Sequence, residues 1–268
     1  MRKLSLFAAL GALLLSAFAC KTQYESLLSS SDVNAKYDAA MEYFQKKKYQ
    51  KAAQLFESMA VLTNGTARDD TVQYYWGLSN YRGKDFYTAE SNFTRFIQDF
   101  PQSPFISEAR FYRLDCLYRA TLRWELDQTP TRACMVAITE YMRENPDDRG
   151  HLEACHHMLL DLQDRLDRKD YEAGKQYYRM EDYPAARTKL RNVLKTNADN
   201  NYREEVLYYT AMSSYHYARL SVWQKQKERY LVFSDDYLNF IGEYPESRHR
   251  KELDGLYRHV QKILEKNN

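Results

Sequence analysis

The sequence has 268 residues, of which 28% are charged and 44% hydrophobic, with 39 Lys and Arg against 37 Asp and Glu. Because the formal charge is only +2, the chain has no basic surface of the size that nucleic-acid binding needs, and we expect no nucleic-acid partner. Only eight Gly occur, and the phosphate-binding and nucleophile motifs of enzymes are missing. We therefore expect no enzyme, no catalytic residues and no cofactor.

The first nineteen residues have the features of a secretory signal peptide. Arg2 and Lys3 precede an apolar run from Leu4 to Leu15, and small residues follow as far as Ala19. The apolar run is too short to span a bilayer, which needs about 20 such residues. We predict that residues 1–19 are a signal peptide.

Cys20 directly follows this predicted signal peptide. Ala17-Phe18-Ala19 also satisfies the rule for ordinary signal cleavage, so a soluble secreted protein is the alternative. A soluble protein has no reason to begin with Cys, however, and cleavage here would place Cys20 first. We therefore predict lipid attachment at Cys20, with residues 20–31 forming the lipidated N-terminus and a flexible tether.

A repeated spacing organises the rest of the chain. A small residue is followed by Ala twelve positions later, an apolar residue four further on, and a helix-ending position eight beyond that. Such spacing is typical of helix pairs that bury one face each and stack on their neighbours. We expect the small residue to meet the Ala where the two helices cross. The pattern occurs at Gly77-Ala89-Phe93-Pro101, Ala40-Ala52-Phe56-Asn64 and Gly174-Ala186-Leu190-Ala198.

Two irregular units and a final helix complete the predicted fold. Phe105–Pro146 contains an internal loop, and Tyr202–Pro245 contains an insertion that lengthens a loop or a helix. Asp148–Arg179 has no Pro and is compatible with one helix of about 48 Å. An amphipathic helix over about Ser247–Lys266 would cap the array. We therefore predict an all-α fold of about five helix pairs with a C-terminal capping helix.

One cluster, HLEACHHM at residues 151–158, contains potential metal ligands. His151 and Cys155 are four residues apart and would share a helix face. Structural zinc needs four ligands, usually from a second paired motif, and the sequence has none. We therefore predict no metal site, and expect Cys155, like Cys116 and Cys134, to be a small buried residue.

The first helices of the early units are rich in aromatic residues and Met. In a repeat array these helices line the concave surface, where such side chains bind extended or helical peptides with little sequence demand. The alternative is that the same side chains pack between helices. The predicted peptide-binding groove consists of Tyr37, Met41, Phe44, Tyr74, Leu78 and Tyr81.

The repeated spacing resembles the tetratricopeptide repeat, with its pattern G-x2-Y, A-x3-F and P. It appears as Ala40-x2-Tyr43 with Ala52-x3-Phe56, and as Gly174-x2-Tyr177 with Ala186-x3-Leu190. The resemblance implies a tetratricopeptide-repeat superhelix. Together with the lipid-attachment signal, the repeats resemble the BamD family of outer-membrane β-barrel assembly lipoproteins. The segments most similar to that family are Asp161–Leu194 and Phe93–Tyr118.

This resemblance implies a non-enzymatic, lipid-anchored scaffold on the periplasmic face of the outer membrane. Unfolded outer-membrane protein substrates would bind the N-terminal repeats in residues 32–146. The barrel-forming BamA-type subunit would bind the C-terminal repeats in residues 147–268. One alternative function is a periplasmic repeat adaptor that coordinates cell-wall or division enzymes, and another is a helical metal-binding protein.

Overall fold

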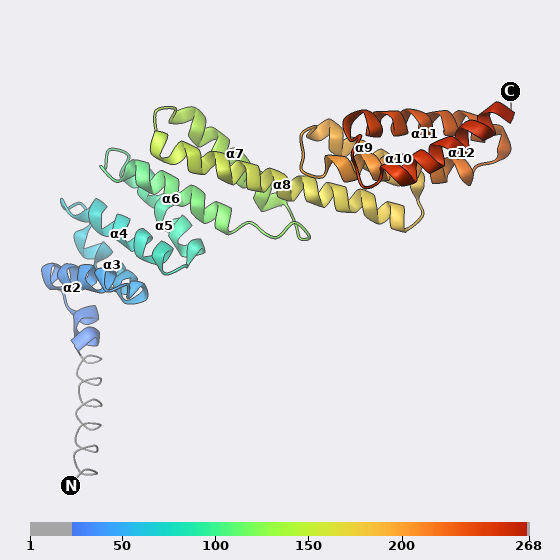
Figure 1. Ribbon diagram of the computed structural model, residues 1–268. Coiled ribbons are helices and arrows are strands. Elements are labelled where there is room, and N and C mark those ends of the chain that lie inside the picture. Colours follow the sequence, from blue (N-terminus) through green and yellow to red (C-terminus); the bar gives the residue numbers. More distant parts are fainter. Residues whose placement is uncertain (1–22, 267–268) are drawn as a thin grey trace, which may run out of the picture. The chain divides into compact units, whose positions relative to one another are not determined.

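The computed structural model of the protein describes residues 23–266, and within this part every regular element is an α-helix (Figure 1). The all-α prediction is therefore confirmed. The predicted signal peptide and Cys20 lie outside the described residues. None of the described helices is both long and apolar enough to cross a membrane. The helices are α2 (Val33–Gln45), α3 (Tyr49–Thr63), α4 (Asp69–Arg82), α5 (Phe86–Asp99), α6 (Ile106–Arg119), α7 (Thr129–Glu144), α8 (Arg149–Arg179), α9 (Tyr183–Thr196), α10 (Arg203–Arg219), α11 (Trp223–Glu243) and α12 (Arg250–Lys266).

The helices belong to two compact units. The first unit consists of the chain up to Thr121 together with Pro130–Glu153, and the second of Leu122–Thr129 and the chain from Ala154 onward. The division predicted from the sequence, between residues 146 and 147, falls in the loop before α8. The compact units divide a little later, inside that helix.

Consecutive helices pack against each other within each unit. In the first unit α2 packs on α3, α3 on α4, α4 on α5 and α5 on α6; in the second, α9 packs on α10 and α10 on α11 (Figure 1). The predicted continuous helix is confirmed as α8, which has 31 residues. The expected insertion lengthens helices, because α10 and α11 have 17 and 21 residues where α9 has 14. The fold is thus a series of tetratricopeptide-type helix pairs closed by α12.

The turns inside three of these pairs share one backbone conformation. In each turn a non-glycine residue has a positive φ, at 58° for Lys47, 66° for Lys84 and 61° for Glu181. This left-handed conformation costs a residue with a Cβ roughly 1 kcal/mol or more, so the surrounding packing must impose it. The three helix pairs therefore share the backbone conformation of their turns as well as their sequence spacing.

The residue after each left-handed position is the N-cap of the second helix of the pair. The Asp85 carboxylate accepts a hydrogen bond from the backbone N–H of Thr88, and the Asp182 carboxylate accepts one from that of Ala185. Lys48 occupies the same position before α3 and makes no side-chain capping bond. An acidic N-cap satisfies a helix N–H that has no partner within the helix, and Lys cannot replace it.

A glycine of the first helix lies under a large side chain of the second. A Cβ on Gly174 would lie 2.7 Å from the side chain of Leu190, and one on Gly77 would lie 3.0 Å from that of Phe93. We expected the small residue to meet the Ala at the crossing, but the nearest side chain at both glycines belongs to another residue of the second helix. The closest residue is the apolar one four positions later, because glycine leaves room for its side chain over the helix backbone.

Aromatic rings connect successive pairs. In the first unit the ring of Phe56 stacks on Tyr75 with centroids 5.9 Å apart, and Tyr74 stacks on Phe105 at 4.4 Å. These contacts join α3 to α4, and α4 to Phe105, the N-cap of α6. The second unit has corresponding ring contacts at Tyr171–Tyr202, Tyr178–Tyr209 and Tyr237–Tyr257.

Residues 23–29 form a helix, although the sequence predicted a flexible tether over residues 20–31. The reason is Tyr24, whose ring is buried against the first helix pair. Its hydroxyl donates to the backbone oxygen of Lys51 at 3.1 Å and lies 2.7 Å from Oε1 of Gln54. The tether prediction is therefore wrong for this part of the chain.

Replacing Gly174 with Ala tests the close approach of α8 and α9. A Cβ increases helix propensity by about 1 kcal/mol, but overpacking against the fully buried Leu190 costs about 1–3 kcal/mol. We expect Gly174→Ala to lower the free energy of unfolding by about 1 kcal/mol, measured by urea denaturation followed by circular dichroism. Gly255 in α12 has no atom near its missing Cβ, so Gly255→Ala should instead raise it by about 0.5–1 kcal/mol. Equal stabilisation by the two variants would contradict the close contact.

Candidate functional site

Two of the six predicted groove residues belong to the core of the first unit. Tyr74 is 6% exposed and Leu78 is 8% exposed, and both pack in one apolar cluster between α4, α5 and α6. The ring of Tyr74 is stacked on Phe105. These two side chains therefore hold helices together and do not line an open surface.

The other four predicted groove residues are half-buried. Tyr81 packs against the same cluster as Tyr74, and its hydroxyl donates to Asp115 at 2.5 Å. Burial and this hydrogen bond raise the pKa of Tyr81 to about 12, so the hydroxyl keeps its proton near neutral pH. The remaining three pack against the core of the first pair: Tyr37, Met41 and Phe44. The structure thus uses much of the predicted aromatic surface for packing.

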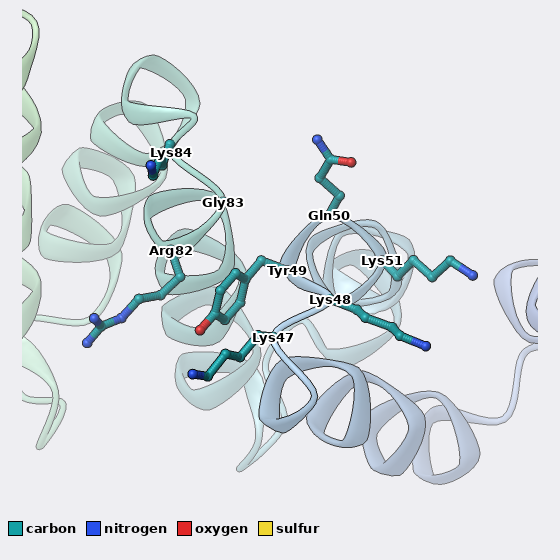
Figure 2. Close-up of a pocket in the computed structure, with 8 residues that line it drawn as sticks. All are labelled: Lys47, Lys48, Tyr49, Gln50, Lys51, Arg82, Gly83 and Lys84. Atoms are coloured by element: carbon teal, nitrogen blue, oxygen red, sulfur yellow. The ribbon is translucent and has the colours of Figure 1, made fainter.

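A different depression runs between α3 and α4 and consists of three adjoining pockets of about 440, 520 and 670 Å³. The first and second share Gln50 and Gly83, and the second and third share Glu57 and Trp76. We call this depression the α3–α4 groove. Figure 2 shows its first pocket, where Tyr49 lies between Lys47 and Arg82. The residues that line the second pocket are Gln50, Ala53, Gln54, Glu57, Trp76, Ser79, Asn80, Gly83, Asp85 and Thr88. The residues that line the third pocket are Glu57, Ala60, Val61, Asn64, Gly65, Asp69, Gln73, Trp76, Arg95, Asp99 and Phe100.

The chemistry of the α3–α4 groove changes along its length. The first pocket is basic, the second is lined mainly by uncharged polar side chains, and the third includes three carboxylates and one Arg. Trp76 contributes a half-buried indole to both the second and the third pocket. An aromatic side chain surrounded by amides suits a ligand with both apolar and hydrogen-bonding groups.

Asp69, one of the residues that line the third pocket, has a buried carboxylate oxygen without a hydrogen-bond partner in residues 23–266. Asp69 is 6% exposed, and its Oδ2 accepts a hydrogen bond from the backbone N–H of Gly65 at 2.9 Å. Oδ1 of the same carboxylate has no partner among the described residues. A buried acceptor left in this state costs about 1–3 kcal/mol.

The sequence contains a pattern that predicts this groove, but the repeat landmarks do not include it. Asp69, Gln73, Trp76 and Asn80 recur at spacings of four, three and four residues, which places them on one face of α4. Their neighbours Tyr74 and Leu78 lie on the opposite, buried face. A Trp within an otherwise polar stripe makes its own face of α4 a candidate binding surface.

The second unit has an exposed apolar tip where α10 meets α11. Leu220, Val222 and Trp223 lie within four residues and are 64%, 66% and 78% exposed. Exposed Trp with neighbouring apolar residues is typical of protein-binding surfaces. The same unit contains a pocket of about 560 Å³ lined by four Glu, but two of these, Glu205 and Glu243, form ion pairs. The apolar tip is therefore the stronger candidate contact.

The potential metal ligands of HLEACHHM take part in packing. The ring of His151 stacks on Phe111 with centroids 4.1 Å apart, and its Nδ1 lies 2.9 Å from Oδ2 of Asp148. Cys155 is fully buried, as are Cys116 and Cys134. No group of three or more potential metal ligands occurs in residues 23–266.

The Asp148 carboxylate connects several helices of the first unit. Burial disfavours its charged form, but hydrogen bonds from Tyr141, His151 and Ser107 outweigh burial and lower the pKa of Asp148 to about 2. Because the pKa is about 3.8 in an unfolded chain, the carboxylate stabilises the fold fully above about pH 4. This contribution is lost as the pH falls toward 2.

Substituting Asp148 tests this assignment. The side chain is 20% exposed, so solvent reduces its contribution, and we expect Asp148→Asn to lower the free energy of unfolding by about 1–2 kcal/mol at pH 7. The difference from the unsubstituted protein should shrink between pH 4 and pH 2, as urea denaturation at each pH would show. A difference that stays constant over this range would mean that the carboxylate charge is not responsible.

Comparison with known proteins identifies the family. The chain matches the YfiO family of outer membrane lipoproteins over residues 29–231, more than half of its length. No curated protein is a significant match. Among solved structures it is similar to a TPR repeats protein from Bacteroides fragilis, at 14% identity and a TM-score of 0.42, over 87% of this chain and 100% of that one. On the family match, the chain belongs to the YfiO family of outer membrane lipoproteins.

Proposed function

We propose that the protein is a lipid-anchored periplasmic scaffold of the machinery that assembles β-barrel proteins in the outer membrane. Membership of the YfiO family, the stacked helix pairs and the resemblance to BamD support this role. The observation that carries the proposal is the α3–α4 groove, which is open and lined by amides around one Trp. As a scaffold the protein would act by binding and not by catalysis.

The α3–α4 groove suits an unfolded segment of an outer-membrane protein. Such a segment presents backbone N–H and C=O groups that need partners, and its side chains alternate between polar and apolar. The amide side chains of Gln50 and Gln73 each provide a donor and an acceptor along the groove. Gln54 and Asn80 add an amide N–H group and a C=O group, because Oε1 of Gln54 accepts from Tyr24 and Nδ2 of Asn80 donates to Asn92. Trp76 offers an apolar surface among them. Recognition through backbone groups would accept many different sequences, as a general assembly factor requires.

The second unit would dock the barrel-forming BamA-type subunit. Its exposed tip at Leu220, Val222 and Trp223 provides an apolar anchor of the kind that dominates binding energy at protein interfaces. This arrangement assigns substrates to the first unit and the partner subunit to the second, as the resemblance to BamD implies. The tip lies within the matched part of the chain.

Two Trp→Ala variants separate binding of substrate peptides from binding of the barrel-forming partner. We expect Trp76→Ala to weaken binding of a labelled peptide from an outer-membrane β-strand at least tenfold, because losing an aromatic anchor costs about 2 kcal/mol or more. The measurement is fluorescence anisotropy with the purified chain. Trp223→Ala, the same substitution on the other unit, should bind the peptide normally but lose the barrel-forming partner in pull-downs from detergent-extracted membranes.

Specific results would contradict the proposal. Unchanged peptide binding by Trp76→Ala would exclude the α3–α4 groove as the substrate site. Mass spectrometry of the unsubstituted pull-down that found cell-wall or division enzymes without a barrel-forming protein would favour the adaptor function. Equal loss of both activities in both variants would indicate misfolding, which circular dichroism would reveal.

The anchor is tested by removing its attachment residue. If Cys20 is acylated, Cys20→Ala should move the protein from the membrane fraction to the soluble fraction, because acyl chains provide most of the membrane affinity. Fractionation of cells followed by immunoblotting measures this change. An unmodified Cys20 in the N-terminal peptide of the mature protein would contradict lipid attachment.

A further inference from the structure

A cluster of cations occupies the helix turns at one end of the first unit. Lys47, Lys48 and Lys51 surround the turn between α2 and α3, and Arg82 and Lys84 belong to the neighbouring turn between α4 and α5. We call these five residues the basic turn patch. Figure 2 shows Lys48 and Lys51 extending to the same side of the first turn, whereas Lys47 and Arg82 lie on either side of Tyr49.

No ion pair neutralises a cation of the patch among the described residues. The nearby Glu42 pairs with Lys46 and is also attracted to Lys48, and Asp85 follows Lys84, so acids offset only part of the five positive charges. Four of the five side chains are exposed, and Lys51 is half-buried. Because the whole chain is almost neutral, this concentration of charge is a local feature with an outward field.

Aromatic rings hold part of the patch beside the N-terminal segment. Lys51 Nζ lies 4.8 Å from the ring centroid of Tyr24 and 5.4 Å from that of Tyr43. Lys48 Nζ lies 5.9 Å from the Tyr43 ring. The two rings contact each other edge to face at 5.4 Å. These cation–π contacts place the ammonium groups next to the point where the chain leads toward Cys20.

The length of the connecting chain limits how far the patch can be from the lipid-attachment residue. Tyr24 is four positions after Cys20, and even a fully extended chain spans at most about 14 Å over that distance. An acylated Cys20 lies at the membrane surface. Lys51, whose ammonium group lies 4.8 Å from the Tyr24 ring, is therefore held close to lipid headgroups, and the rest of the basic turn patch adjoins it in the same pocket.

Lys48 is also not the residue type that helix stability favours at an N-cap. The equivalent positions, Asp85 and Asp182, cap the helices that follow them, whereas Lys48 makes no capping hydrogen bond. Because Lys48 lacks the stabilising cap that the other two turns have, we infer that this lysine serves a role other than folding.

We propose that the basic turn patch binds the phosphate groups of anionic lipid headgroups in the membrane that holds the lipid anchor. The proposal rests on the lipid anchor in the proposed function, because the anchor brings the patch to the surface. The patch lines the first pocket of the α3–α4 groove, so binding would turn that end of the first unit toward the membrane and leave the second and third pockets extending away from the surface. An acidic protein segment could satisfy the same charges, but the short chain to Cys20 favours the membrane.

The test uses the mature chain with Cys20→Ser, so that no acyl chain contributes to binding. We expect it to sediment with vesicles containing about one-third phosphatidylglycerol and not with pure phosphatidylcholine vesicles, and added salt should weaken the binding. A fourfold variant, with Lys47, Lys48, Lys51 and Lys84 changed to Gln, should bind at least tenfold more weakly, since each Lys near an anionic surface strengthens binding about fivefold.

A matched control removes the same charge elsewhere. Changing four exposed lysines of the second unit, Lys195, Lys251, Lys262 and Lys266, to Gln should leave vesicle binding nearly unchanged. Equal loss in both variants would mean that only net charge matters and would overturn the proposal. So would unchanged binding by the patch variant, or equal sedimentation with neutral vesicles. Competition by inorganic phosphate at constant ionic strength would indicate a site for free phosphate instead.

Lys48→Asp separates lipid binding from folding. The variant restores the cap found in the equivalent turns, so thermal denaturation should show a higher Tm while vesicle binding weakens several-fold. Weaker binding with a lower Tm would point to misfolding and count against the proposal. Because the vesicle assay needs no acylation, failure of the anchor in cells and failure of the basic turn patch give different results.

Discussion

Contact between aromatic rings of successive helix pairs is the interaction on which the rest of the structure depends. A single pair buries one face and is not stable alone, so each pair must provide a surface for the next. Phe56 of the first pair meets Tyr75 of the second, and Tyr74 of the second meets Phe105 at the start of the third. A large ring fills this gap with two rotatable bonds, which limits the conformational entropy that packing costs.

This use of the rings determines where a ligand can bind. Tyr74 and Leu78 face the core of the first unit, so the proposed binding surface lies on the opposite face of α4, where Gln73, Trp76 and Asn80 line the α3–α4 groove. Packing and recognition therefore use different faces of one helix. A groove on rigid helices needs little reorganisation to accept an extended chain, which lowers the entropic cost of binding.

The two compact units differ in the surfaces that they expose. The first unit has a cluster of unpaired cations beside the segment that leads to Cys20, and the second unit has an apolar tip around Trp223. Charge attracts a phosphate-rich surface over several ångströms, whereas exposed apolar groups bind only when a complementary protein surface removes them from water. The two surfaces thus suit different partners, and a scaffold at a membrane needs both kinds.

The sequence by itself determined the all-α class, the paired helices, the continuous α8 and the family resemblance, because these follow from periodic spacing and local helix signals. It did not reveal which aromatic residues are buried, since Tyr74 and Trp76 lie on opposite faces of α4 and only the neighbouring pairs decide which face is covered. It also mistook residues 23–29 for a tether, because the burial of Tyr24 requires side chains of α3 that are distant in sequence. Only the tertiary structure decided these points, because burial is a property of contacts between helices and not of any one helix.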